Sequence, residues 1–159
     1  MSKCVLLLSL FLATAIHAQS IHKMNIIELD DYIVRSEKPL IVNFWATFCK
    51  PCVDEIPYFV SFIKNRYAGE VDLVLVSLDP KEFYPRKISS FAENQKFGAP
   101  IIWLNETNAN YFCPKINVRW SGAIPATLMI NNKKGVKRFY ERQLTSLQFE
   151  KELRLLMEN

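Results

Sequence analysis

The feature that most constrains the fold is a continuous apolar run that leads directly into two closely spaced cysteines. Residues 40–46 are apolar except for Asn43 and include β-branched and aromatic side chains, which is typical of a central strand buried on both faces. Cys49 and Cys52 follow, and apolar residues then recur at helical spacing over residues 50–67. A strand that runs into a helix is a βα unit, so we expect the cysteine pair at the first turn of that helix.

Further strands and helices alternate along the rest of the chain. The expected order is α-β-α-β-α-β-α-β-β-α, which favours one α/β domain with a mostly parallel central sheet, helices on both faces, and a C-terminal β-hairpin plus helix. Glycines at the expected element boundaries support this division. Beyond the first βα unit, helices are expected at residues 25–36, 86–97, 109–118 and 144–157, and strands at 71–78, 101–104, 126–130 and 136–141.

The first 18 residues have the pattern of a secretory signal peptide. Lys3 gives a positive start, residues 5–16 are apolar, and Ala18 is a small residue at a plausible cleavage point. A run of about 12 apolar residues is shorter than the roughly 20 that cross a bilayer as a helix, so cleavage is favoured over anchoring. We therefore expect residues 19–159 to form the mature domain, in the periplasm or another extracytoplasmic space, without a transmembrane anchor.

The distribution of charge does not indicate a nucleic-acid-binding surface. The 159-residue chain has a formal net charge of +4, which is mild. It has no long run of Lys and Arg, and Lys133 and Lys134 fall in an expected turn. The basic residues are therefore interpreted as part of a solvated surface, and nucleic acid is not expected as a partner.

The placement of the two cysteines suits disulfide exchange. Exchange needs a thiolate, and the free N–H groups and dipole at a helix start favour that anion. Lys50 adds a neighbouring cation, and Pro51 is tolerated because first-turn N–H groups have no intrahelical partner. Two intervening residues place Cys52 one turn inside the helix, where it can attack a mixed disulfide formed at Cys49.

The stretch WATFCKPC resembles the active-site signature of the thioredoxin superfamily, and CKPCVDEIP resembles its exported TlpA/ResA-like branch. The resemblance covers nearly the whole mature chain. It implies a thioredoxin-like fold in which Cys49 is the attacking nucleophile and Cys52 the resolving thiol. It also implies that the redox-active disulfide Cys49–Cys52 does the chemistry without a further cofactor.

The same resemblance implies a substrate groove opposite the cysteines. Residues 122–127 match the family's cis-proline motif, which makes Pro125 the cis-proline and gives the Ile124 main chain the role of pairing with an extended substrate. Trp45 is a further candidate for the docking surface, although an aromatic residue in a buried strand is as often core. The stretch between Cys52 and Pro125 is longer than in a minimal thioredoxin and holds an extra strand-helix unit.

Two residues distinguish the chain from thioredoxins proper. Asn43 stands where those proteins usually have a buried Asp that helps to move a proton from the resolving cysteine, and Asn43 cannot ionise. Glu55 matches a carboxylate of the ResA-like branch, and one helical turn brings it near the pair. We expect Glu55 to be the proton acceptor and, with Asn43 and Lys50, to tune the pKa of the thiols. A solvated helix carboxylate is the alternative for Glu55.

Two other classes compete with an oxidoreductase. A Cys-x-x-Cys pair also binds zinc or copper, but a structural zinc site needs four ligands and the mature chain adds only His22 and Cys113, so no metal site is expected. A non-catalytic thioredoxin-like module would keep the pair as a structural disulfide. Cys113 stays free, pairs with another chain, or is buried as a small hydrophobe.

The resemblance favours a reductant that acts on cysteine-containing exported proteins, as in cytochrome c maturation, and that a membrane electron donor recharges. Peroxiredoxins lack a CxxC at this site, so peroxidase activity is not favoured. The direction of electron flow depends on the reduction potential, which the residues between the cysteines do not determine by themselves.

Overall fold

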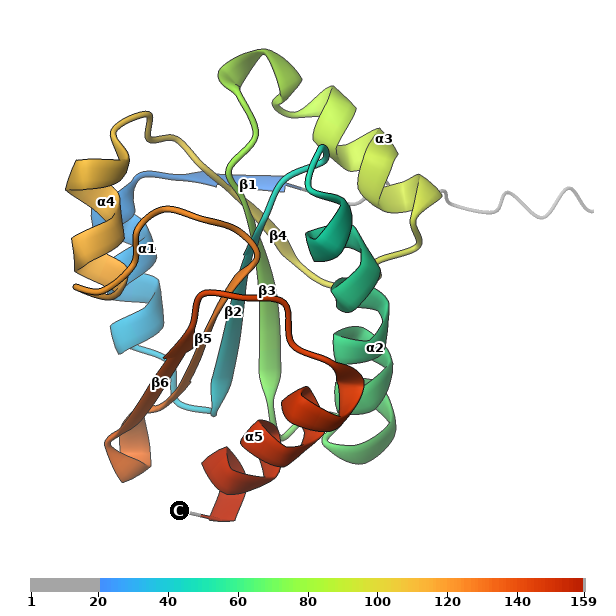
Figure 1. Cartoon of the computed structure of the whole chain (residues 1–159), viewed down its shortest axis with the longest axis vertical. Helices are drawn as coiled ribbons and strands as arrows, with labels where there is room; N and C mark the ends of the chain where they lie inside the picture. The colour runs from blue at the N-terminus through green and yellow to red at the C-terminus, as the bar shows by residue number, and fades with distance from the viewer. Residues whose placement is uncertain (1–20, 159) are drawn as a thin grey trace, which may run out of the picture.

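The computed structural model describes residues 21–158, and the expected signal peptide lies outside the described residues. Strands and helices alternate through this part of the chain (Figure 1). No helix among residues 21–158 is long and apolar enough to span a membrane. The elements are β1 (Ile21–Met24), α1 (Ile26–Val34), β2 (Leu40–Trp45), α2 (Lys50–Arg66), β3 (Asp72–Ser77), η1 (Lys81–Phe83), α3 (Arg86–Asn94), β4 (Ile101–Leu104), α4 (Ala109–Ile116), β5 (Ala126–Asn131), η2 (Asn132–Lys134), β6 (Val136–Tyr140) and α5 (Ser146–Glu158).

The strands form one mixed sheet in the order β1-β4-β3-β2-β5-β6. β2 runs parallel to β3 and antiparallel to β5, and Phe44 near the end of β2 lies opposite Ala126 at the start of β5. β2 leads into the cysteine pair. The start of β5 therefore lies at the same end of the sheet as the cysteine pair. The register also places Asn43 directly opposite Thr127.

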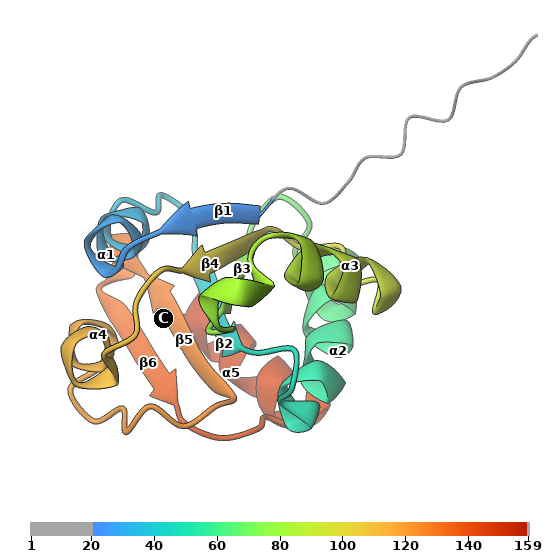
Figure 2. The same cartoon turned by 90° about the horizontal axis from the view of Figure 1, so that it is seen from above.

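Helices cover both faces of the sheet, as Figure 2 shows from above. α1 and α4 lie on one face, and α2, α3 and α5 lie on the other. Side chains alternate across β2, so Ile41, Asn43 and Trp45 share the face that carries α2. Asn43 is therefore a polar residue in the middle of an apolar layer.

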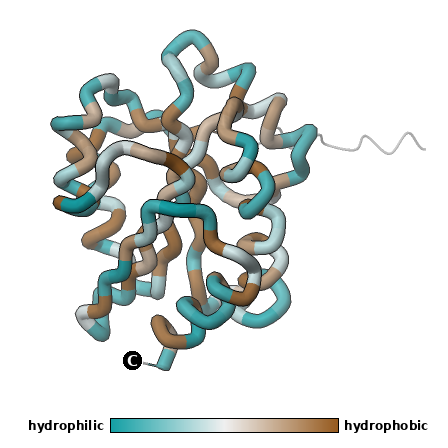
Figure 3. The backbone as a smooth tube through the Cα atoms, in the orientation of Figure 1, coloured by the Kyte–Doolittle hydropathy of each residue, from teal (hydrophilic) through white to brown (hydrophobic). Residues whose placement is uncertain are grey.

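Hydrophobic residues concentrate in the central strands, and hydrophilic residues at the outer turns and helix faces (Figure 3). Every residue of β2 and of β5 is buried. Burial on both faces explains why these strands read as continuous apolar runs rather than as alternating patterns. The expected thioredoxin-like arrangement of helices around a mixed sheet, with a closing hairpin and helix, is confirmed.

The structure adds a strand that the sequence pattern did not predict. β1 pairs in parallel with β4 at the edge of the sheet. Its four residues include exposed His22 and Lys23, so the strand has too little apolar pattern to be recognised locally. Pairing with a distant strand, rather than its own sequence, makes it extended. Short 3-10 helices also occupy two connections, η1 after β3 and η2 in the hairpin turn.

Candidate active site

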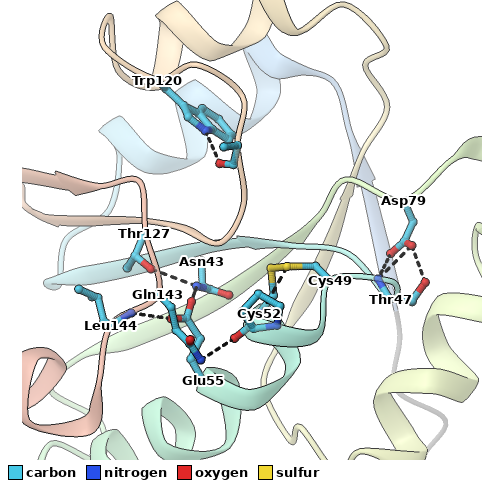
Figure 4. The surroundings of a disulfide bond; sticks show 12 residues. Asn43, Thr47, Cys49, Cys52, Glu55, Asp79, Trp120, Thr127, Gln143 and Leu144 are labelled. Atoms are coloured by element: carbon cyan, nitrogen blue, oxygen red, sulfur yellow. Dashed lines mark hydrogen bonds between the residues drawn. A yellow bond between two sulfur atoms is a disulfide. The ribbon is translucent and has the colours of Figure 1, made fainter.

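The two cysteines form a disulfide at the start of α2, with their Cα atoms 5.3 Å apart (Figure 4). Cys49 is the N-cap residue, and its Sγ accepts a hydrogen bond from the Cys52 backbone N–H at 3.3 Å. Cys49 keeps 8% of its surface exposed, whereas Cys52 is fully buried. Of the two cysteines, only Cys49 keeps exposed surface, which fits the predicted roles of attacking and resolving cysteine.

Lys50 and Pro51 occupy the first two helical positions between the cysteines. Lys50 Nζ lies 2.7 Å from the Asp54 carboxylate, and 83% of the Lys50 side chain is exposed. An exposed pair of this kind contributes little electrostatic energy because water screens it. The effect of Lys50 on the thiols stays a prediction. The Asp54 carboxylate offsets part of the positive charge of Lys50.

The proline opposite the pair is cis, as the motif predicts: the Ile124–Pro125 peptide bond is cis. Pro125 directly precedes β5, and the antiparallel register brings that end of β5 to the end of β2. Ile124 packs against the apolar cluster that contains both cysteines. The loop and the pair therefore border the same surface. A second cis bond, Tyr84–Pro85, was not predicted.

Glu55 is fully buried beside Asn43, not solvated on the helix surface. Its Oε1 accepts a hydrogen bond from Asn43 Nδ2 at 2.8 Å, and its Oε2 accepts one from the Leu144 backbone N–H at 2.9 Å. Asn43 Nδ2 also donates to Thr127 Oγ1 at 3.0 Å. Figure 4 shows these side chains gathered from β2, α2, β5 and the segment before α5.

Burial raises the pKa of Glu55 to about 7, although the hydrogen bonds from Leu144 and Asn43 favour the charged form and oppose the shift. Such a carboxyl is divided between its charged and neutral forms near neutral pH. It can accept a proton there and release it again, which an exposed glutamate with an ordinary pKa does poorly. The chemistry of the position therefore suits the expected proton acceptor.

Asn43 carries an unused acceptor in the same layer. Both hydrogens of its amide nitrogen are donated, one to Glu55 and one to Thr127. Its Oδ1 is buried and has no hydrogen-bond partner within the described part of the chain. A buried acceptor without a donor is unfavourable, so Asn43 Oδ1 is a polar atom whose burial costs stability.

The exposed aromatic residue beside the pair is Phe48, not Trp45. Trp45 packs in the same apolar cluster as the two cysteines and has no exposed surface, so the expectation that it lines the docking surface is revised. Phe48 immediately precedes Cys49 and is 69% exposed. The exposure of Phe48 could have been predicted from the sequence, because Phe48 falls in the turn after β2 whereas Trp45 lies inside the strand.

Asp79, which the sequence reasoning missed, holds the turn before the pair. Its buried carboxylate accepts hydrogen bonds from Thr47 Oγ1 at 2.6 Å, from the Thr47 backbone N–H at 3.1 Å and from Ser77 Oγ at 2.8 Å. The Asp79 carbonyl accepts one from Trp103 Nε1 at 2.8 Å. The segment that follows β3 thereby anchors the turn that presents Cys49. A local pattern shows only an Asp-Pro break at this position.

The third cysteine of the expected mature chain is free and buried. Cys113 lies on α4, and burial raises the pKa of its thiol to about 11, with the Glu141 charge acting in the same direction. It therefore stays a neutral thiol at physiological pH, in agreement with its interpretation as a small buried hydrophobe. Within residues 21–158, no three side chains of His, Cys, Asp or Glu gather in a way that would hold a metal ion.

Comparison with known families gives a match over most of the chain. Residues 13–139 match the model of the AhpC/TSA family. Among curated proteins, the chain is 28% identical over 119 residues to the thioredoxin-like protein YneN of Bacillus subtilis (strain 168), which covers 74% of this chain and 65% of that protein. It is 27% identical over 109 residues to the thiol-disulfide oxidoreductase ResA of Geobacillus thermodenitrificans (strain NG80-2), covering 68% and 57%.

A third relative is the sporulation thiol-disulfide oxidoreductase A of Bacillus subtilis (strain 168), 31% identical over 80 residues, which are 50% of this chain and 48% of that protein. The chain thus spans between 48% and 65% of the length of these curated relatives. Their names describe them as thioredoxin-like proteins or thiol-disulfide oxidoreductases.

Solved structures share the fold. A thioredoxin-related protein from Neisseria meningitidis serogroup B superposes with a TM-score of 0.65 at 24% identity, over 78% of this chain and 88% of that one. A secreted disulfide oxidoreductase from Mycobacterium tuberculosis gives a TM-score of 0.57 at 16% identity, over 76% and 84%. These likenesses establish the thioredoxin-like fold.

Proposed function

The chain belongs to the AhpC/TSA family, and we propose that it is a thiol-disulfide oxidoreductase that exchanges disulfides with cysteine-containing proteins outside the cytoplasm. One observation carries the proposal. The Cys49–Cys52 disulfide lies at a helix start, Cys49 keeps 8% of its surface exposed while Cys52 is fully buried, and a cis-proline loop lies at the same end of the sheet. The names of the curated relatives support the same reaction.

In the reducing direction, the reaction transfers two electrons from the dithiol to the substrate. The Cys49 thiolate attacks one sulfur of a substrate disulfide, the substrate S–S bond breaks, and one substrate sulfur leaves as a thiolate. The Cys52 thiolate then attacks the Cys49 sulfur of the mixed disulfide. This second step releases the other substrate thiolate and forms the Cys49–Cys52 disulfide.

Cys52 must lose a proton before it can attack, and Glu55 takes it. Cys52 is buried, so water does not reach its thiol directly. Glu55 follows one helical turn later, and its burial raises the pKa to about 7, so its charged form is available as a base at neutral pH. Asn43 orients the Glu55 carboxylate through the hydrogen bond to Oε1.

The substrate chain lies between Phe48 and the cis-proline loop. Phe48 offers an exposed apolar ring on the residue that directly precedes Cys49. The backbone of Ile124 precedes the cis bond and pairs with an extended substrate segment. Recognition through main-chain groups and one apolar contact tolerates many sequences around the target cysteine.

We assign the physiological direction as reduction, with exported proteins as substrates and a membrane electron donor that reduces the pair again. The resemblance of the motif CKPCVDEIP to the TlpA/ResA-like branch supports this direction, with cytochrome c maturation as the model for the client. The signal-peptide pattern of residues 1–18 supports an extracytoplasmic location. A reduction potential near the roughly −270 mV of thioredoxin supports reduction, and one near the roughly −120 mV of DsbA contradicts it.

A trapping experiment tests the exchange itself. Cys52→Ser removes the resolving thiol, so the variant should accumulate a mixed disulfide with a disulfide-containing protein such as insulin, released by dithiothreitol. Cys49→Ser is the matched control and should trap nothing. If Cys52→Ser also traps nothing, the chain is a non-catalytic module. Stoichiometric metal in the purified protein, lost when both cysteines become Ser, would instead support a metal site.

A further inference from the structure

The segment 141–144, which is part of the connection between β6 and α5, contacts both sides of the proposed substrate groove. On one side, Glu141 Oε1 accepts hydrogen bonds from the backbone N–H of Ser121 at 3.0 Å and of Ala123 at 3.1 Å. The Ser121 hydroxyl donates to the same oxygen. One carboxylate oxygen thus gathers three donors from two residues of a single loop.

This loop leads directly into the cis-proline. Ala123 is followed by Ile124, whose backbone is proposed to pair with the substrate. Trp120 Nε1 donates to the Ala123 carbonyl at 2.9 Å, so Ala123 is held through its N–H by Glu141 and through its carbonyl by Trp120. Gly122 lies between Ser121 and Ala123, the two residues that Glu141 holds. Its φ of 97° is a backbone conformation that favours glycine.

The same segment also holds the helix that carries the cysteines. Gln143 Nε2 donates to the Pro51 carbonyl at 3.1 Å, in the peptide group that joins Pro51 to Cys52. The Leu144 backbone N–H donates to Glu55. Over four consecutive residues, the chain is therefore fastened first to the cis-proline loop and then to α2. This segment therefore connects the two sides of the proposed groove.

We infer that Glu141 is a positioning residue for protein substrates: its carboxylate holds residues 121–123, and so places the Ile124 backbone relative to Cys49. The inference rests on the proposed function, because the groove has a purpose only if a substrate chain enters it. Glu141 does not touch the reacting sulfurs. Its contribution is expected in substrate binding rather than in the chemistry of the disulfide.

The test compares Glu141→Ala with Glu141→Gln, which keeps an acceptor oxygen at the same place. A matched control is Glu150→Ala, which removes a carboxylate paired with Arg154 on α5. For Glu141→Ala, we expect the KM for insulin to rise about tenfold, the effect of losing a charge-assisted hydrogen bond. The reduction potential should not shift, and exchange with 2-hydroxyethyl disulfide should fall far less. Glu141→Gln should recover most of the loss.

Amide hydrogen exchange gives a readout that does not depend on activity. In Glu141→Ala, the amides of Ser121 and Ala123 should exchange about tenfold faster than in wild type, while that of Leu144 stays unchanged. Unchanged exchange at Ser121 and Ala123, or equal losses for insulin and the small disulfide, would overturn the inference. If wild type does not reduce insulin, the proposed function fails. Faster exchange would then leave Glu141 as a loop anchor without a role in substrate binding, which also overturns the inference.

Discussion

The backbone N–H of Leu144 donates a hydrogen bond to Glu55 Oε2 at 2.9 Å, although the two residues lie 89 positions apart in the chain. Together with the hydrogen bond from Asn43, this contact gives each oxygen of a fully buried carboxyl a donor. The protein thus holds an ionisable group inside its core, one helical turn after the buried Cys52. A carboxyl in that position has consequences for both reactivity and stability.

We expect the rate of resolving a mixed disulfide to depend on a group with a pKa of about 7, the value to which burial raises Glu55. Below this pH, Glu55 is protonated and cannot accept the Cys52 proton, so the rate should fall as the pH decreases. Glu55→Gln should remove this dependence and slow the step about 100-fold near neutral pH. The rate of this step at each pH is measured by stopped-flow detection of substrate release from the Cys49 mixed disulfide. A Glu55→Gln profile that keeps the inflection would assign it to another group.

Stability should also depend on Glu55. The folded protein keeps the Glu55 proton up to about pH 7, whereas an unfolded glutamate loses it near 4.5. Folding therefore takes up a proton between these values, and stability should fall as the pH rises through this window. Glu55→Gln cannot ionise, so wild type should lose about 3 kcal/mol relative to this variant between pH 4 and pH 8. Urea unfolding of the oxidised proteins measures the difference, and Glu150→Gln should parallel wild type.

Asn43→Ala should raise the pKa of Glu55 further. In wild type, the hydrogen bond from Asn43 to Glu55 Oε1 favours the charged carboxylate, and the variant removes it. The variant also removes the hydrogen bond from Asn43 to Thr127 Oγ1. The cavity left by the truncated side chain and the lost hydrogen bonds should lower the free energy of unfolding by about 2 to 3 kcal/mol. A carbon-13 NMR titration of the Glu55 carboxyl follows the pKa. Thr127→Val is the matched control, because it disturbs Asn43 but leaves the donor to Glu55 in place.

Asp79→Ala should loosen the turn that presents Cys49. The variant leaves the Thr47 N–H, the Thr47 hydroxyl and the Ser77 hydroxyl without their acceptor in a mostly buried site. We expect a loss of about 3 kcal/mol in the free energy of unfolding. The reaction of Cys49 with a small disulfide should also slow. Thr47→Val removes one of these bonds and should show a smaller loss; an equal or larger loss would show that Asp79 is not the anchor.

Local patterns were sufficient for the elements that bury continuous apolar runs or a clear helical face. β2, α2, β5 and the hairpin follow from residues that are neighbours in sequence. β1 did not follow, because its four residues become a strand only through pairing with β4. Asp79 and Glu141 were missed for a related reason. A carboxylate that anchors a distant loop leaves no period in the sequence. Its partners are backbone N–H groups, which every residue except proline has, and hydroxyls of Ser and Thr, which are common in loops.

The sequence by itself determined the cysteine pair at a helix start, and the resemblance of its motifs predicted the cis-proline at Pro125. Both features depend on the order of residues within short segments. Only the tertiary structure decided the state of Glu55, because a pKa depends on which groups exclude water and which donate hydrogen bonds. Those groups come from β2 and from the segment before α5, which the chain brings together only when it folds.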